Sequence, residues 1–137
     1  DFTSGCFQPV IGDSAELGKV RRVVLTSGKL YYDLAAARAK SGDTSIALVR
    51  VERLYPLPVD EIKAELAKYP ADAELVWAQD EPANMGAWPF MALKLPPHLE
   101  GRELKRVSRR ASSSPAVGSA KIHALEQQGL VAAVFSE

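Results

Sequence analysis

Three groups of polar and charged residues in this sequence have types and spacings that can do chemistry. The first is Thr26-Ser27-Gly28-Lys29, which follows a short β-branched run and precedes a segment with helical spacing. Backbone N–H groups at a helix N-terminus, together with a lysine, can hold an anion. The stretch lacks the longer glycine-rich sequence of a P-loop. We therefore favour a tight turn in which Ser27 caps the helix and Gly28 allows close packing, and we keep Lys29 as a candidate anion ligand.

The second group is the segment 79–88, which reads QDEPANMGAW and follows a predicted strand. Functional loops of open α/β sheets lie at such strand ends. Its two adjacent carboxylates would need a perturbed environment to act as acid or base. We favour a turn shaped by Asn84 and Gly86, with Trp88 packing on a neighbouring domain or subunit. The candidate interface residues are Asp80, Glu81, Asn84 and Trp88.

The third group is a run of five cations between residues 102 and 110, followed by three serines at 112–114. Such a run fits a phosphate-bearing ligand or an acidic partner surface. It equally fits a solvated edge strand whose charge prevents pairing with other chains, and the acidic pair at 80–81 can neutralise part of it. Both interpretations stay open here. With the lysine of the first group, the candidate anion or effector ligands are Lys29, Arg106, Arg109 and Arg110.

The remaining residues that often serve as nucleophiles or metal ligands do not form a site in the sequence. His98 and His123 are far apart and have no second ligand at metal spacing. Cys6 has no nearby base or helix N-terminus that would make it a nucleophile. Ser27 lacks the G-x-S-x-G context of a hydrolase. We therefore expect no catalytic, cofactor-binding or metal-binding residue in this chain.

Composition limits the classes of function. The chain has 137 residues, the size of one domain, and its 17 basic residues balance 17 acidic ones. A neutral chain gives no electrostatic reason to expect nucleic-acid or membrane binding. A single cysteine suits a reducing compartment, so we expect a cytoplasmic protein. Because the first residue is Asp1 rather than methionine, we expect the chain to be a piece of a longer polypeptide.

These groups must be positioned by alternating strands and helices. Residues 1–18 are interrupted by Gly and Pro and are interpreted as a linker, which leaves 19–137 as one α/β domain. Alternation of strands with helices predicts a three-layer α/β/α sandwich with a mostly parallel mixed sheet of about five strands. The fifth strand is expected in the linker or near the end. The predicted strands are 23–25, 46–51, 75–78 and 104–109; the predicted helices are 29–41, 59–69, one from near 86 that stops before 96, and 119–135.

Four strings carry a resemblance to a known family. Taken together and in this order, they resemble the C-terminal domain of the decarboxylating component of 2-oxoglutarate dehydrogenase. Their sequences are most similar to those of its actinobacterial members. The resemblance covers nearly the whole chain. Met85 stands where the family usually has glutamine, which bears on the polarity of that position and not on the fold. The strings are TSGKLYYDL at 26–34, VRVERLYPLP at 49–58, QDEPANMGAW at 79–88 and RRASSSPAVG at 109–118.

The resemblance implies more than the residues alone. It implies a fold like the C-terminal domain of transketolase, packed on the catalytic domains of a homodimer. Thiamine diphosphate and magnesium would lie between two earlier domains of the polypeptide, so no catalytic residue carries over to this chain. The intact enzyme of the tricarboxylic acid cycle would decarboxylate 2-oxoglutarate and pass a succinyl group to the lipoyl arm of a succinyltransferase component. Some family members respond to a nucleotide or to acetyl-coenzyme A.

Two other hypotheses remain beside the enzyme-domain one. The chain can be a stand-alone module that binds an effector such as acetyl-CoA or AMP, which would use Lys29 and the cations after residue 102. It can also be a docking module that relies on Trp88 and the acidic pair before it. The docking hypothesis is compatible with the enzyme-domain hypothesis, because a domain can serve an enzyme by assembling it.

Overall fold

The computed structural model describes residues 8–13, 15, 17–109 and 120–136, with the backbone alone at 109 and 120–123. Its sheet runs in the order β1-β3-β2-β4-β5, and only the β1–β3 pairing is antiparallel. The strands are β1 (Val10–Ile11), β2 (Arg22–Thr26), β3 (Ile46–Val51), β4 (Glu74–Pro82) and β5 (Leu104–Arg109). The helices are α1 (Leu30–Ser41), α2 (Val59–Leu66), α3 (Trp88–Lys94), the short 3₁₀ helix η2 (Pro96–His98) and α4 (Ala120–Phe135).

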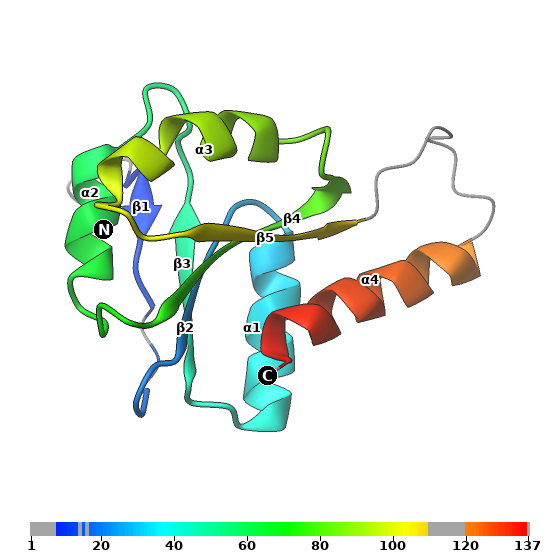
Figure 1. Cartoon of the computed structure of the whole chain (residues 1–137). Coiled ribbons are helices and arrows are strands. Elements are labelled where there is room, and N and C mark those ends of the chain that lie inside the picture. The colour runs from blue at the N-terminus through cyan, green and yellow to red at the C-terminus, as the bar shows by residue number, and fades with distance from the viewer. Residues whose placement is uncertain (1–7, 14, 16, 110–119, 137) are drawn as a thin grey trace.

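The helices cover both faces of the sheet and so form three layers. Helices α2 and α3 lie on one face, and α1 and α4 lie on the other (Figure 1). This confirms the predicted α/β/α sandwich with a mostly parallel sheet. The fifth strand is β1, which comes from the segment that the sequence suggested as a linker and pairs with the end of β3.

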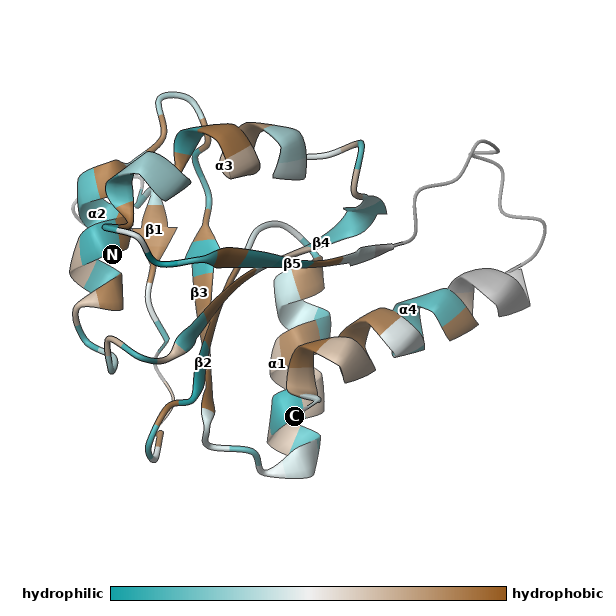
Figure 2. Ribbon diagram, in the orientation of Figure 1, coloured by the Kyte–Doolittle hydropathy of each residue, from teal (hydrophilic) through white to brown (hydrophobic). Residues whose placement is uncertain are grey.

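Two apolar cores hold the layers together. Strands β2 and β3 are almost continuously buried, as expected for strands covered on both faces. One core places Trp77 and Leu25 against α2 and α3, and the other places Leu48 and Val76 against α1 and α4. Figure 2 shows the hydrophobic residues along the strands and on the helix sides that face them, with polar residues turned outward.

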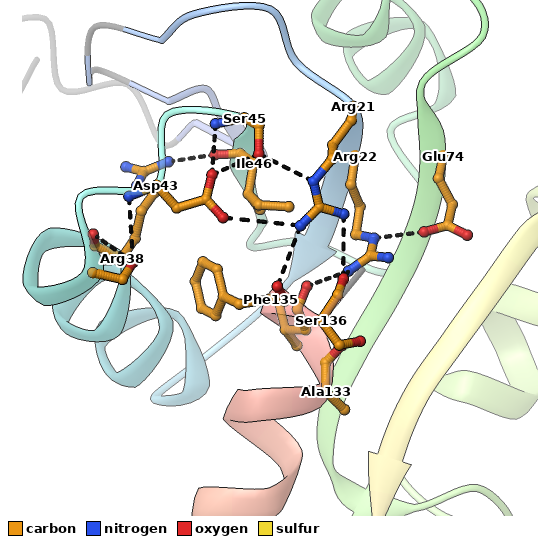
Figure 3. A network of polar contacts seen from close by, with 12 residues as sticks. Arg21, Arg22, Arg38, Asp43, Ser45, Ile46, Glu74, Ala133, Phe135 and Ser136 are labelled. Atoms are coloured by element: carbon orange, nitrogen blue, oxygen red, sulfur yellow. Dashed lines mark hydrogen bonds and ion pairs between the residues drawn. The ribbon is translucent and has the colours of Figure 1, made fainter.

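Two neighbouring arginines anchor the end of α4 to the sheet. The guanidinium of Arg22 donates to the carbonyl oxygens of Val134 (2.5 Å) and Ser136 (2.8 Å), while Arg21 donates to that of Phe135 (3.2 Å) (Figure 3). Arg22 also pairs with Glu74 of β4 (2.5 Å). Cations near a helix C-terminus satisfy its last carbonyls and suit its dipole. The C-terminal end of the last helix is thereby tied to β2 and β4.

A buried carboxylate ties the segment before β2 to the layer formed by α1. Asp13, whose side chain is 1% exposed, forms a two-point ion pair with Arg38 and accepts the N–H of Leu48 (2.8 Å). Burial, the largest influence, raises the pKa of Asp13, but the bonds from Arg38 and from the backbone outweigh it, and the pKa lies below its ordinary value. The hydrogen-bonded ion pair with Asp13 in turn raises the pKa of Arg38.

Candidate functional site

A pocket of about 510 Å³ lies at the carboxyl ends of β2 and β4, where open α/β sheets commonly bind ligands. The turn after β2 forms one wall, the loop after β3 a second, and the end of β4 with the start of α3 a third. Its lining residues are Ser27, Gly28, Lys29, Leu54, Tyr55, Trp77, Gln79, Asp80, Glu81, Gly86, Ala87 and Phe90.

Gln79 organises the floor of the pocket. Its side-chain oxygen accepts the indole N–H of Trp77 (2.9 Å) and the backbone N–H of Trp88 (2.7 Å). Its amide nitrogen lies within 3.2 Å of the carbonyl oxygen of Glu81 and 2.8 Å of those of Pro82 and Met85. The residue is only 4% exposed. A single buried amide therefore fixes the path of the chain from β4 into α3.

The turn between β4 and α3 depends on a glycine. Gly86 has φ +65°, a conformation that side chains rarely adopt, and a Cβ there would lie 2.7 Å from a carboxylate oxygen of Glu81. The expectation that Gly86 shapes this turn is confirmed. Asn84 and Met85 are exposed at its tip, so the residue that replaces the family's usual glutamine faces outward.

The turn after β2 differs in two ways from its prediction. Lys29 occupies the N-cap position of α1, and no side chain makes a capping hydrogen bond, so the cap predicted for Ser27 is wrong. Gly28 has φ +69°, and a Cβ added to it would have no heavy atom within 4 Å. The turn needs glycine for its left-handed backbone conformation and not for close packing. Lys29 itself is exposed on the pocket wall.

Charged groups of both signs line the pocket without pairing to each other. Among the residues that the structure describes, no ion pair joins Lys29 to Asp80 or Glu81. One carboxylate oxygen of Asp80 is buried and has no hydrogen-bond partner there. The pocket also has an aromatic part, because the rings of Tyr55 and Phe90 pack with centroids 4.4 Å apart. Tyr55 is nevertheless 71% exposed.

Trp88 has a mixed environment. It is half-buried and packs against the core beneath α3. The guanidinium of Arg106 lies 5.9 Å from the centre of its ring. Part of this tryptophan therefore belongs to the domain's own packing, and the rest is available at the surface beside the candidate interface residues.

The cations of the basic run whose side chains the structure describes lie just before and along an edge strand, and none of them lines the pocket. β5 is the outer strand of the sheet beside β4. Arg102 donates to the carbonyl of Ala73 (2.8 Å), and Lys105 pairs with Glu74 (2.5 Å). Of the described residues that line the pocket, Lys29 is the single cation. The side chain of Arg109 and the whole of Arg110 lie outside the described residues, so the candidate effector ligands remain an expectation.

The histidines and acidic residues do not add a metal site in the described part of the chain. His98 is exposed in η2. Nowhere in 8–13, 15, 17–109 and 120–136 do three His, Cys, Asp or Glu side chains gather so that they could hold a metal ion. Cys6 and the side chain of His123 lie outside the described residues. Within the same ranges, no helix has the length and apolar character needed to cross a membrane.

Sequence reasoning missed three residues that build the pocket. Tyr55 and Phe90 are 35 positions apart and meet only because the loop after β3 folds against α3. Gln79 is the first residue of the segment 79–88, but the sequence alone does not distinguish a buried glutamine from an exposed one. Its position directly after an apolar run was the available clue.

The fold and the pocket define an α/β/α sandwich domain with a ligand-sized cavity at its strand ends. Comparison with known proteins narrows this class. Residues 1–135 match the family model described as 2-oxoglutarate dehydrogenase C-terminal, and the chain belongs to that family.

Its relatives are much longer proteins. The chain is 48% identical over 139 residues to the 2-oxoglutarate dehydrogenase E1/E2 component of Corynebacterium glutamicum. It is 43% identical over 143 residues to the multifunctional 2-oxoglutarate metabolism enzyme of Mycolicibacterium vanbaalenii. Each match covers 98% of this chain, but the first spans only 11% and the second only 12% of the relative. The actinobacterial resemblance inferred from the four strings is confirmed.

Proposed function

We propose that this chain is the C-terminal assembly or regulatory domain of a longer, thiamine-diphosphate-dependent 2-oxoglutarate dehydrogenase. The observation that carries the proposal is the family match over residues 1–135. The names of the two relatives support it, and so does the small share of their length that the chain spans. On this proposal the longer enzyme decarboxylates 2-oxoglutarate and succinylates a lipoyl arm, and this domain alone does neither.

The residues that the structure describes do not fit thiamine diphosphate with magnesium. A diphosphate needs several cationic or N–H donors, whereas the described pocket has one lysine and two carboxylates. A magnesium ion needs oxygen ligands in a cluster, which the described residues lack. We therefore place the cofactor in other domains of the longer enzyme, and no chemical step is assigned here.

The wider organisation is part of the same proposal. The domain comprises residues 19–137 together with β1 and Asp13 of the preceding segment, and earlier catalytic domains of the longer enzyme come before it. The longer enzyme is a cytoplasmic homodimer of the tricarboxylic acid cycle and hands its product to a lipoyl-bearing succinyltransferase. Asp80, Glu81, Asn84 and Trp88 form the interface, which is supported by the exposure of Glu81 and Asn84.

Comparing the chain with the longer enzyme tests the proposal. An antibody against this chain should detect a polypeptide many times its size in cell extract, and that polypeptide should reduce an artificial electron acceptor when given 2-oxoglutarate, thiamine diphosphate and Mg²⁺. The isolated chain should show no turnover in the same assay. Turnover by the isolated chain, or an endogenous band that matches its own size, contradicts the proposal.

Effector binding is a second proposal, supported by the exposed cation Lys29 beside the pocket. A phosphate of acetyl-CoA or AMP would contact Lys29 from outside the pocket, whose own lining is net negative, and the other candidate ligands are Arg106, Arg109 and Arg110. Calorimetry with each compound tests it, with Arg53→Ala as a control outside the candidate set. Absence of heat at millimolar ligand, or equal affinity after Lys29→Ala and Arg106→Ala, rules the proposal out.

A further inference from the structure

The charge of the strand-end pocket favours a cationic occupant. Its lining has two carboxylates, Asp80 and Glu81, against the single ammonium of Lys29, and none of the three is paired with another among the described residues. A pocket lined by an excess of one sign of charge attracts groups of the opposite sign. The excess here is negative, which is the wrong sign for a phosphate.

Among the residues that the structure describes, Asp80 has one unsatisfied hydrogen-bond acceptor. One of its carboxylate oxygens is buried without a partner among the described residues. A buried acceptor left unpaired is unfavourable. The chain around it cannot easily shift to find a donor, because Gln79 fixes the backbone from Glu81 to Trp88. Asp80 also lines the pocket, where its carboxylate can accept an N–H group from a ligand.

The aromatic rings of Tyr55 and Phe90 favour one kind of cation over another. Tyr55 and Phe90 form a paired surface beside the carboxylates, and Tyr55 is 71% exposed. A guanidinium is planar, presents several N–H donors in a fixed fork and stacks on aromatic rings, while an ammonium is a compact, strongly hydrated charge. The combination of acceptors and a ring surface therefore suits arginine better than lysine.

We propose that this pocket binds the arginine side chain of another segment of the longer polypeptide. The proposal rests on the proposed function, because the relatives extend far beyond the part that this chain matches and can supply such a segment in cis. The guanidinium donates to Asp80 and Glu81 and packs over Tyr55 and Phe90. Lys29 flanks the opening and disfavours a second cation beside the first.

A titration of the isolated chain tests the chemistry of the pocket. The probe is a tripeptide, alanine-arginine-alanine, with both ends blocked, and its counterpart carries citrulline, which is nearly isosteric and uncharged. The readouts are the NMR signals of the Trp77 indole N–H and the Gly86 amide, since both residues line the pocket. The arginine peptide should shift both signals and the citrulline peptide neither. Asp80→Asn and Glu81→Gln should each weaken binding about tenfold, the usual scale for one charge-assisted hydrogen bond.

Asp72→Asn is the matched control, because it removes the same charge from an exposed turn away from the pocket. Its affinity for the peptide should equal that of the unaltered chain. Three results overturn the proposal: no shift at millimolar arginine peptide, equal binding of the citrulline peptide, or equal affinity in the Asp80 and Glu81 variants. Tighter binding of free L-arginine, lost in Lys29→Met, would show an amino-acid site instead and also overturn it.

A labelling experiment tests the source of the arginine. Ser27 lies on the pocket wall, so Ser27→Cys in a Cys6→Ser background gives a thiol at the site. A maleimide should modify this thiol quickly in the isolated chain and at least tenfold more slowly in the longer enzyme, where the pocket is filled. Equal rates, read by mass spectrometry of the labelled peptide, overturn the cis occupant. Neither result depends on decarboxylase activity, so failure here is distinct from failure of the proposed function.

Discussion

The side-chain oxygen of Gln79 accepts hydrogen bonds from Trp77 and Trp88. Its amide nitrogen donates to carbonyl groups of the loop between β4 and α3, three of which lie within hydrogen-bond distance. The residue is buried at 4% exposure. Water cannot readily replace these bonds, so the loop geometry depends on one amide. The consequence is a residue with no direct chemical role that nevertheless determines the shape of the candidate site.

Replacing Gln79 with leucine should therefore destabilise the domain far more than its size suggests. The substitution keeps the volume but leaves the Trp77 indole N–H and the Trp88 backbone N–H without acceptors, for a loss of about 3 kcal/mol in the free energy of unfolding. Urea denaturation measures it. Gln128→Leu, at an exposed position of α4, is the control and should change stability by less than about 0.5 kcal/mol. Equal effects of the two would show that the hydrogen bonds contribute nothing.

Asp13 gives the chain a predictable response to acid. Its pKa in the folded state lies below the ordinary 3.8 because Arg38 and two backbone N–H groups outweigh its burial. A carboxyl group with a depressed folded-state pKa contributes stability at pH values above 3.8, and that contribution is lost as the pH falls through the folded-state pKa. Lowered pKa values at Asp43 and Glu74 act in the same direction.

Asp13→Asn should lower the free energy of unfolding by about 3 kcal/mol near pH 7, since it leaves the Arg38 guanidinium partly buried and unpaired. The difference from the unaltered chain should shrink as the pH falls below 3.8. Urea denaturation across pH, with Asp72→Asn as an exposed control, measures both. A difference that stays constant down to low pH would mean that the charge of Asp13 plays no part.

At the scale of elements, the attachment of α4 depends on its last turn. Arg22 has 9% exposure and bonds two carbonyl oxygens at that end, whereas the Arg21 side chain is 37% exposed. Because burial strengthens such contacts, Arg22→Met should speed amide exchange in the last turn of α4 by an amount that corresponds to about 2 kcal/mol. Arg21→Met should have a smaller effect. The reverse order, or no change in either variant, would refute this account of the anchor.

The elements also show what the sequence can and cannot predict. The bounds of β3 and β5 match their prediction, and Leu104 and Val107 pack on opposite faces as their alternation requires. Helix α2 ends at Leu66 rather than at 69, because the N–H groups of Lys68 and Tyr69 bond three residues back and close turns. β4 extends to Pro82, beyond its apolar run.

The parts that escaped prediction depend on distant contacts. β1 is only two residues long, and it exists as a strand because Val10 pairs with Val51, forty-one positions away. The pocket likewise depends on the loop after β3 meeting α3 and on one buried amide. Local sequence patterns do not indicate contacts between residues that lie far apart in the chain. The four strings identified the family, while the geometry of the site came only from the folded chain.

At the scale of the whole molecule, the N-terminal boundary of the domain can be tested by experiment. The sequence suggested that the domain begins at residue 19, after a linker. The structure places β1 at the edge of the sheet and Asp13 in contact with α1 and β3, so residues 8–18 contribute a strand pairing and a buried ion pair. These contacts connect the start of the described chain to β3 and the first helix.

We therefore expect a chain that begins at residue 19 to be less stable than one that begins at residue 8. Loss of the ion pair alone leaves Arg38 without its carboxylate partner and should cost about 3 kcal/mol, a large part of the stability of a typical domain. Thermal unfolding of the two truncated chains beside the full one measures this. Val10→Ala in the longer chain separates packing of β1 from the ion pair, and Asp13→Asn isolates the pair itself. Equal stability of the two truncated chains would show that residues 8–18 act as a linker, as the sequence alone suggested.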